Sequence, residues 1–99
     1  MAAMGLSELA QKLEQLVSAE PKSSQELQGW YALAHEVEDS LVCEGGLGPT
    51  VPHLLWHFLS DADLRMKDSM YGSLQHKQIS ILINILRQGR MPDDHELSV

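Results

Sequence analysis

Histidines and carboxylates recur at one-turn spacing in two segments, an arrangement by which a helix can present metal ligands. His53, His57 and Asp61 follow one another at intervals of four, so on a helix they lie along one side. His35 and Asp39 form a second pair with the same spacing. Imidazole nitrogens and carboxylate oxygens bind zinc and other divalent ions, so a metal site is one hypothesis for these residues.

The metal hypothesis is the weaker interpretation of these residues. The glutamate of the His-Glu-x-x-His motif is missing between His53 and His57. Both one-turn pairs also fall on the polar sides of their predicted helices, where histidine keeps a surface soluble. We therefore expect no bound metal and no cofactor, and keep divalent-metal binding through His53 and His57 as an alternative.

Other signatures of catalysis are missing from the sequence. There is no Gly-x-Ser-x-Gly nucleophile motif. The glycine-rich segment 44–49 lacks the Gly-Lys-Ser/Thr ending of a phosphate-binding loop, and it predicts a turn between two helices. A helical bundle of this size has little room for a buried pocket. We expect a protein that is not an enzyme.

An aromatic side chain among charged ones points to binding instead. Trp56 lies about a third of a turn from the apolar stripe of its predicted helix. Two interpretations stay open: the indole belongs to the core, or it is partly exposed, as aromatic residues of interaction surfaces are. The candidate interaction surface consists of His53, Trp56, His57, Asp61 and Asp63.

The acidic residues of this surface also have a structural explanation. Asp61 with Arg65, and Asp63 with Lys67, are one-turn pairs that predict ion pairs of about 0.3–0.5 kcal/mol each. Ser60 followed by Asp63 predicts a capped helix start, so the helix should break near this point.

The formal net charge of −7 excludes some partners. Phosphate backbones and anionic membrane surfaces attract clustered Lys and Arg, so we expect neither nucleic acid nor a membrane as a partner. The charge is uneven, with eight acidic side chains against two lysines in residues 1–44. Either the two halves of the chain complement each other in the fold, or the acidic half meets a basic partner.

Cysteine content and hydropathy indicate the compartment. Cys43 is the only cysteine, whereas small secreted domains usually carry several, so we expect a cytoplasmic location and no chemical role for this thiol. Residues 1–6 lack the basic and apolar regions of a signal peptide. The apolar-rich run 79–86 is far shorter than the about 20 residues that span a bilayer.

Apolar residues at spacings of three and four predict four main helices. These helices cover about residues 7–18, 23–44, 50–60 and 73–88. Pro21 ends the first helix, Ser23 with Glu26 forms a capping box for the second, and Gly89 ends the last. The fold class is therefore all-α, a small antiparallel bundle whose third helix is kinked or interrupted near residues 60–73.

The predicted domain covers residues 1–90, and residues 91–99 form a flexible acidic tail. The last helix is apolar on most sides, so it must be covered on most sides. Either the other helices surround it as the central element, or it pairs with a second copy. In the second case, the homodimer forms through Ile79, Leu82, Ile83 and Leu86.

The leading hypothesis for function is a small helical module that binds another protein as an adaptor, inhibitor or regulatory subunit. It follows from what the sequence lacks, namely a catalytic motif, a pocket and a basic patch. The alternatives are a helical divalent-metal-binding protein that uses His53 and His57, and an acidic mimic of nucleic acid that blocks a basic groove.

Overall fold

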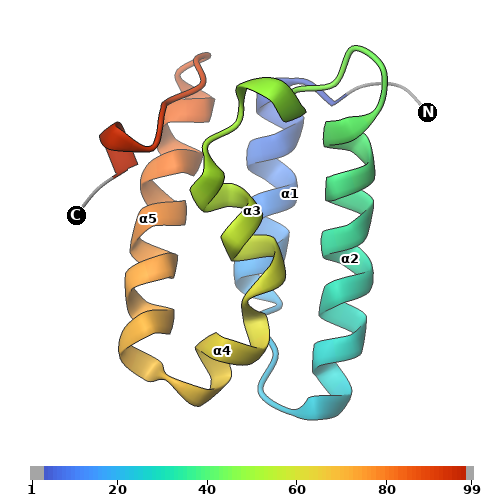
Figure 1. The fold of residues 1–99 in the computed structure, drawn as a ribbon, viewed down its shortest axis with the longest axis vertical. Helices are drawn as coiled ribbons and strands as arrows, with labels where there is room; N and C mark the ends of the chain where they lie inside the picture. Colours follow the sequence, from blue (N-terminus) through green and yellow to red (C-terminus); the bar gives the residue numbers. More distant parts are fainter. Residues whose placement is uncertain (1–3, 98–99) are drawn as a thin grey trace.

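Helices make up most of the chain, and residues 4–97, which the computed structural model describes, contain no strand. The helices are α1 (Leu6–Ser18), α2 (Ser24–Val42), α3 (His53–Ser60), α4 (Ala62–Lys67) and α5 (Ser69–Arg87), with short 3-10 turns at Gly48–Thr50 and His95–Leu97. The predicted bundle of four main helices is confirmed, and α4 is a short addition to it (Figure 1).

The helices pack in two layers. α1 lies between α2 and α5, and α3 and α4 lie across one face of this layer (Figure 1). The molecule measures 34 × 31 × 18 Å, and its shortest dimension is about the thickness of two helices. α1 is therefore the central helix, and α5 lies at an edge of the bundle.

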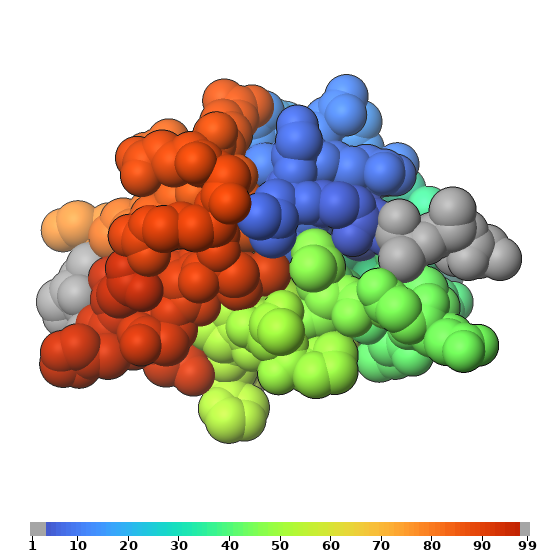
Figure 2. All heavy atoms as spheres, turned by 90° about the horizontal axis from the view of Figure 1, so that it is seen from above, coloured from blue at the N-terminus to red at the C-terminus, as the bar shows by residue number. Residues whose placement is uncertain are grey.

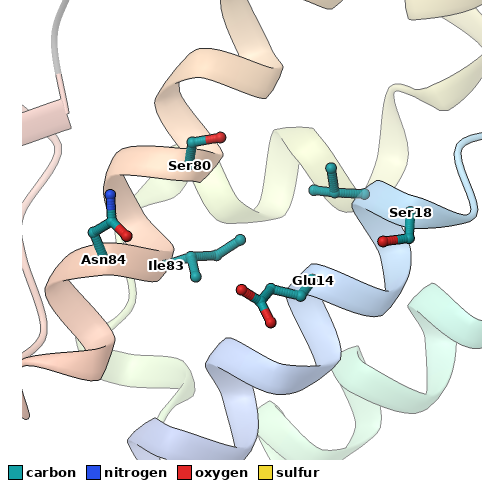
Figure 3. A pocket seen from close by; sticks show the side chains of 6 residues that line it. Glu14, Ser18, Ser80, Ile83 and Asn84 are labelled. Carbon is teal, nitrogen blue, oxygen red and sulfur yellow. The ribbon is translucent and has the colours of Figure 1, made fainter.

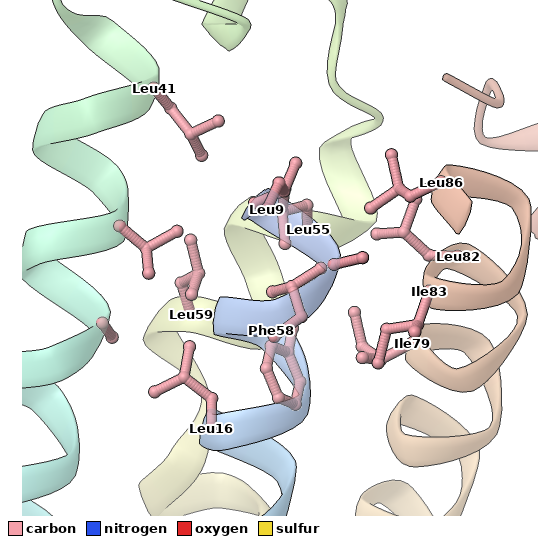
Figure 4. Close-up of a cluster of buried hydrophobic side chains, with 14 of the residues drawn as sticks. Leu9, Leu16, Leu41, Leu55, Phe58, Leu59, Ile79, Leu82, Ile83 and Leu86 are labelled. Atoms are coloured by element: carbon pink, nitrogen blue, oxygen red, sulfur yellow. The ribbon is translucent and has the colours of Figure 1, made fainter. Parts of the chain in front are cut away.

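The core lies where α1, α3 and α5 meet, and α2 closes it on one side (Figure 4). Its largest fully buried side chains are Leu9, Leu13 and Leu16 of α1, Trp30 and Leu41 of α2, Leu55, Phe58 and Leu59 of α3, Ile79, Leu82 and Leu86 of α5, and Leu97. Burying these apolar side chains is the main source of stability, at about 25 cal/mol for each Å² removed from water.

The four residues predicted as a dimer surface lie inside this core. Ile79 and Leu82 are fully buried, and Ile83, the most exposed of the four, keeps 7% of its surface. Side chains of α1 and α3 of the same chain lie against this face of α5 (Figure 4). The predicted homodimer through Ile79, Leu82, Ile83 and Leu86 is therefore wrong for this fold, because one chain already buries these side chains.

The first two helices begin and end close to their predicted bounds. α1 ends at Ser18, and α2 follows a turn through Pro21. At the start of α2, the Ser23 hydroxyl accepts a hydrogen bond from the Glu26 N–H at 3.2 Å. The Glu26 carboxylate accepts one from the Lys22 N–H at 3.0 Å. The first bond satisfies a backbone amide that the helix itself leaves unpaired, and the second ties the Glu26 side chain to the residue before the cap.

The last helix begins earlier than predicted. The Asp68 carboxylate accepts hydrogen bonds from the N–H groups of Met70 and Tyr71, both at 3.1 Å. This cap starts α5 at Ser69 instead of Ser73. The segment 79–86 is helical, as predicted. No helix of the described residues is both long enough and apolar enough to cross a membrane.

The predicted break after Ser60 is confirmed. Asp61 alone separates α3 from α4, with φ −107° and ψ 18°. Ser60 does not cap α4, however, because its hydroxyl donates back to the Trp56 carbonyl oxygen at 2.9 Å. The break turns the chain so that α4 runs towards the first turn of α5 (Figure 1).

The glycine-rich loop is a close-packed turn. A Cβ atom on Gly46 would lie 2.5 Å from the Leu41 carbonyl oxygen, and one on Gly48 would lie 2.6 Å from the same oxygen. Only glycine lets the loop pass so near the last turn of α2. The glycines are therefore required by packing, which agrees with the predicted turn.

Residues 91–97 pack against the helices, whereas the sequence predicted a flexible tail. Leu97 is fully buried. The Asp94 carboxylate accepts hydrogen bonds from the N–H groups of His53 at 3.1 Å and Leu54 at 3.0 Å, at the start of α3. Figure 2 looks onto this end of the molecule and shows the segment (red) beside α3 (yellow-green).

The same contacts act on the pKa of Asp94. Burial raises this pKa. The hydrogen bonds from the Leu54 and His53 N–H groups together lower it by more, so the pKa of Asp94 lies below its ordinary value. A distant carboxylate thus serves as the N-terminal cap that α3 lacks in its own sequence. Residues 98 and 99 of the predicted tail lie outside the described residues.

α4 and α5 approach each other closely at Gly72. A Cβ atom on Gly72 would lie 3.3 Å from the Arg65 carbonyl oxygen and 3.5 Å from the Arg65 Cβ. Gly29 in α2 is different, because a Cβ atom there would meet nothing within 4 Å.

We predict opposite effects for substitutions at these two glycines. Gly72→Leu should lower the free energy of unfolding by about 1–3 kcal/mol, because the larger side chain pushes α4 away from α5. Gly29→Ala should raise it by about 0.5–1 kcal/mol, because alanine favours the helix and fits. Urea unfolding followed by circular dichroism measures both. A Gly72→Leu protein as stable as the wild type would contradict the close crossing.

Candidate functional site

The outward face of α3 presents the two predicted histidines. The side chains of His53 and His57 are 88% and 67% exposed. Trp56 is half-buried and packs against the core, so each of its two interpretations is partly correct. Only part of the indole is available to a partner.

These histidines do not form a metal site with the other predicted ligands. His53 Nδ1 lies 3.4 Å from Asp94 Oδ2, and His57 Nδ1 lies 4.0 Å from Asp61 Oδ2. In the second predicted pair, His35 with Asp39, the His35 imidazole instead lies beside the Glu38 carboxylate. Among residues 4–97, no group of three His, Cys, Asp or Glu side chains is placed to hold a metal ion.

Asp61 and Asp63, the acidic members of the predicted surface, form internal hydrogen bonds. Asp61 Oδ2 accepts hydrogen bonds from the Tyr71 hydroxyl at 2.6 Å and from Gln75 Nε2 at 3.2 Å. Asp63 Oδ1 accepts one from the Tyr31 hydroxyl at 2.9 Å. Both carboxylates therefore hold α4 against its neighbours, and the predicted five-residue surface is reduced to His53, His57 and part of Trp56.

The pKa values of these groups follow from the same bonds. The hydrogen bond from the Tyr31 hydroxyl lowers the pKa of Asp63. Burial is the main reason that the pKa of Tyr31 is raised. The hydrogen bond to Asp61 is the main reason that the pKa of Tyr71 is raised. Both phenols are therefore favoured in their neutral form, and the Asp63 carboxylate in its ionised form.

Arg65 is buried at the junction of the bundle, and its side chain is 1% exposed. Its Nε and Nη2 donate to the two carboxylate oxygens of Glu20 at 2.8 and 3.0 Å. Its Nη1 donates to the Phe58 carbonyl oxygen at 2.7 Å and to Gln75 Oε1 at 2.8 Å. The guanidinium carbon also lies 4.4 Å from the centre of the Phe58 ring and 4.9 Å from that of Trp30.

This arrangement differs from the predicted pairing of Arg65 with Asp61. The paired carboxylate is Glu20, which lies 45 residues away in the turn after α1. The Phe58 carbonyl belongs to the last turn of α3, where backbone oxygens lack helical partners, so Arg65 also caps that helix. His76 Nε2 lies 2.9 Å from Glu20 Oε2, although not in hydrogen-bond geometry. Arg65, Glu20, Gln75 and the Phe58 carbonyl therefore form a buried polar cluster that joins these helices, and we call Arg65 its structural centre.

A shallow groove of about 430 Å³ lies between α1 and α5 (Figure 3). Glu14 and Ser18 of α1 line one side, and Ser80 and Asn84 of α5 line the other. The Glu14 carboxylate is already paired with Arg87. The groove is therefore an open, polar border of α5 with no unpaired charge to attract a small ligand.

The outward side of α5 carries an exposed apolar pair that the sequence prediction missed. Met70 is 83% exposed and Leu74 is 42% exposed, one turn apart on the same helix. Exposed Lys77 and half-buried Ile81 continue the line at intervals of three and four. We call these four residues the α5 outer stripe. The prediction missed it because the helix was expected to start at Ser73.

Comparison of the chain with models of protein families, with curated proteins and with solved structures gives no match. The candidate site therefore rests on the geometry described above.

We predict that Arg65→Met lowers the free energy of unfolding by about 3 kcal/mol or more. Methionine keeps much of the packing of the side-chain stem but leaves Glu20 without its partner. Arg87→Met is the matched control, because the ion pair of Arg87 with Glu14 is about half-exposed and should contribute less than about 1 kcal/mol. Equal effects of the two substitutions in urea unfolding would show that Arg65 is not a structural centre.

Lowering the pH should remove the stabilisation that the hydrogen bond between Tyr31 and Asp63 provides. The folded state depresses the pKa of Asp63 below 3.8, so this bond stabilises the protein above that pH. The stabilisation is lost as the pH falls through the depressed value. In Tyr31→Phe, the NMR titration midpoint of the Asp63 carboxyl should rise towards 3.8. Tyr71→Phe is the control and should leave this midpoint unchanged; an unshifted midpoint in Tyr31→Phe would refute the assignment.

Proposed function

We propose that this protein is a non-enzymatic helical interaction module that binds another protein through the α5 outer stripe. A partner that covers Met70 and Leu74 removes apolar surface from water, which favours association. The edge position of α5 supports this proposal, because a partner can reach the helix without disturbing the core.

The exposed pair of Met70 and Leu74 is the observation that carries the proposal. The exposed large apolar side chains of the described residues are Leu33, Val42, Leu64, Met66, Met70 and Leu74. Single apolar residues on a surface need no explanation, whereas contiguous apolar patches mark interaction sites. Only Met70 and Leu74 are one turn apart on one helix, since Leu33 and Val42 are nine residues apart and Met66 belongs to α4.

We also propose that the module acts in the cytoplasm. Cys43 is the only thiol of the sequence, so no disulfide can form within the chain. Its Sγ donates to the Ser40 carbonyl oxygen at 3.1 Å at the end of α2, which gives this thiol a structural contact.

Affinity capture from the native cell, read by quantitative mass spectrometry, tests the proposed surface. The double variant Met70→Gln/Leu74→Gln should lose at least about 90% of the specifically captured partner, because each truncated anchor typically costs 1 kcal/mol or more. Glutamine favours the helix nearly as well as methionine and leucine, so the melting temperature should change little.

A second double variant, His53→Ser/His57→Ser, is the matched control on the outward face of α3. It should retain the partner, because its positions lie outside the α5 outer stripe. If only this variant failed to capture the partner, the partner would bind α3, and the proposed surface on α5 would be wrong.

A further inference from the structure

The α5 outer stripe has the dimensions of a helix-binding site. Met70, Leu74, Lys77 and Ile81 follow one another at intervals of four, three and four, so they form one line along the helix. At 1.5 Å per residue, this line is about 16 Å long. Anchors with the same periodicity on another amphipathic helix match such a line.

The charged side chains of α5 itself are all basic. The sequence of α5 contains no Asp or Glu, although the whole chain has a net charge of −7. Lys77 lies within the stripe, and Lys67 lies just before the helix; both are exposed. Lys67 is also near enough to Asp63 to help lower the pKa of that carboxyl, so Lys77 is the main charge of the stripe. The nearest carboxylate in sequence, Asp68, accepts hydrogen bonds from the first amides of α5. A partner therefore meets exposed ammonium groups beside apolar side chains.

We propose that the α5 outer stripe binds an acidic amphipathic helix of another protein. This inference rests on the function proposed above and names the chemistry of the partner. Apolar residues of the partner cover Met70 and Leu74, while its carboxylates face Lys77 and Lys67. Complementary charges of this kind accelerate association and reject partners of the wrong sign.

A second copy of this chain does not fit the stripe. If two α5 helices paired antiparallel about the middle of the stripe, Met70 would lie opposite Ile81 and each Lys77 opposite Leu74. The two ammonium groups would then enter the same contact, to which neither helix brings a carboxylate. The acidic residues Glu36 and Asp39 lie on α2, at the opposite edge of the molecule, and α2 does not contact α5 (Figure 1). Pairing α2 of one copy with α5 of the next would give an open chain of molecules.

Two synthetic peptides of about four helical turns test the inference. Both carry leucines at i, i+4, i+7 and i+11; one has glutamates at the flanking positions and the other has lysines. Calorimetric titration of the full chain should show that the glutamate peptide binds at least about tenfold more tightly. Raising the salt from about 0.1 M to about 1 M should reduce this preference, because the screening length falls from about 10 Å to about 3 Å.

Lys77→Glu should remove the preference for the glutamate peptide, and circular dichroism should show an unchanged fold, since Lys77 is exposed. Lys12→Glu is the matched control, because it makes the same change of net charge at an exposed position of α1. Equal binding of the two peptides, or equal effects of the two lysine substitutions, would overturn the inference. Self-association at high concentration that depends on Met70, or stronger binding to anionic lipid vesicles than to the glutamate peptide, would also overturn it.

The two proposals fail in different ways. If cellular capture depends on Met70 and Leu74 but the glutamate peptide does not bind, the proposed function stands and the acidic helix is wrong. If the glutamate peptide binds with the expected Lys77 dependence but no captured protein depends on Met70 and Leu74, the partner chemistry stands and the proposed function is wrong.

Discussion

The buried guanidinium of Arg65 is the interaction on which the arrangement of the bundle depends. It joins the turn after α1 through Glu20, the end of α3 through the Phe58 carbonyl, and α5 through Gln75. A charge with almost no exposed surface is stable only when every donor has a partner, so these elements can meet in few other ways. The short helix α4 carries this side chain to the junction, and Gly72 lets α4 approach α5.

This polar junction decides which residues remain for a partner. Asp61 and Asp63, which the sequence places among charged surface residues, are used to hold α4 through Tyr71 and Tyr31. By contrast, no element of the described chain covers the first turns of α5 on their outward side, because α5 lies at the edge of the bundle and residues 91–97 pack near its other end. The surface that is free to bind is thus what the internal packing leaves uncovered.

The internal packing also decides which charges remain on the surface. Most carboxylates of the first half of the chain lie on α1 and α2, while the charged side chains of α5 are all basic. Glu20 and Glu14 reach across to Arg65 and Arg87, so the two halves of the chain do complement each other at these points. Lys77 is left exposed without an acidic neighbour on its own helix, and this gives the α5 outer stripe its sign.

The sequence by itself determined the local elements. Apolar periodicity, Pro21 and the capping box of Ser23 and Glu26 predict the first two helices, since each depends on residues within one turn. The break after Ser60 lies where the sequence predicts it, but the Ser60 cap on which that prediction rested does not form. Only the tertiary structure decided three further features: the pairing of Arg65 with Glu20, the packing of Leu97 and Asp94 against the start of α3, and the exposure of Met70 and Leu74. The first two features depend on contacts between residues that are distant in sequence. The third depends on which side of α5 the rest of the chain covers. Local periodicity carries no information about either, because a helix with two apolar sides does not specify which side becomes the core.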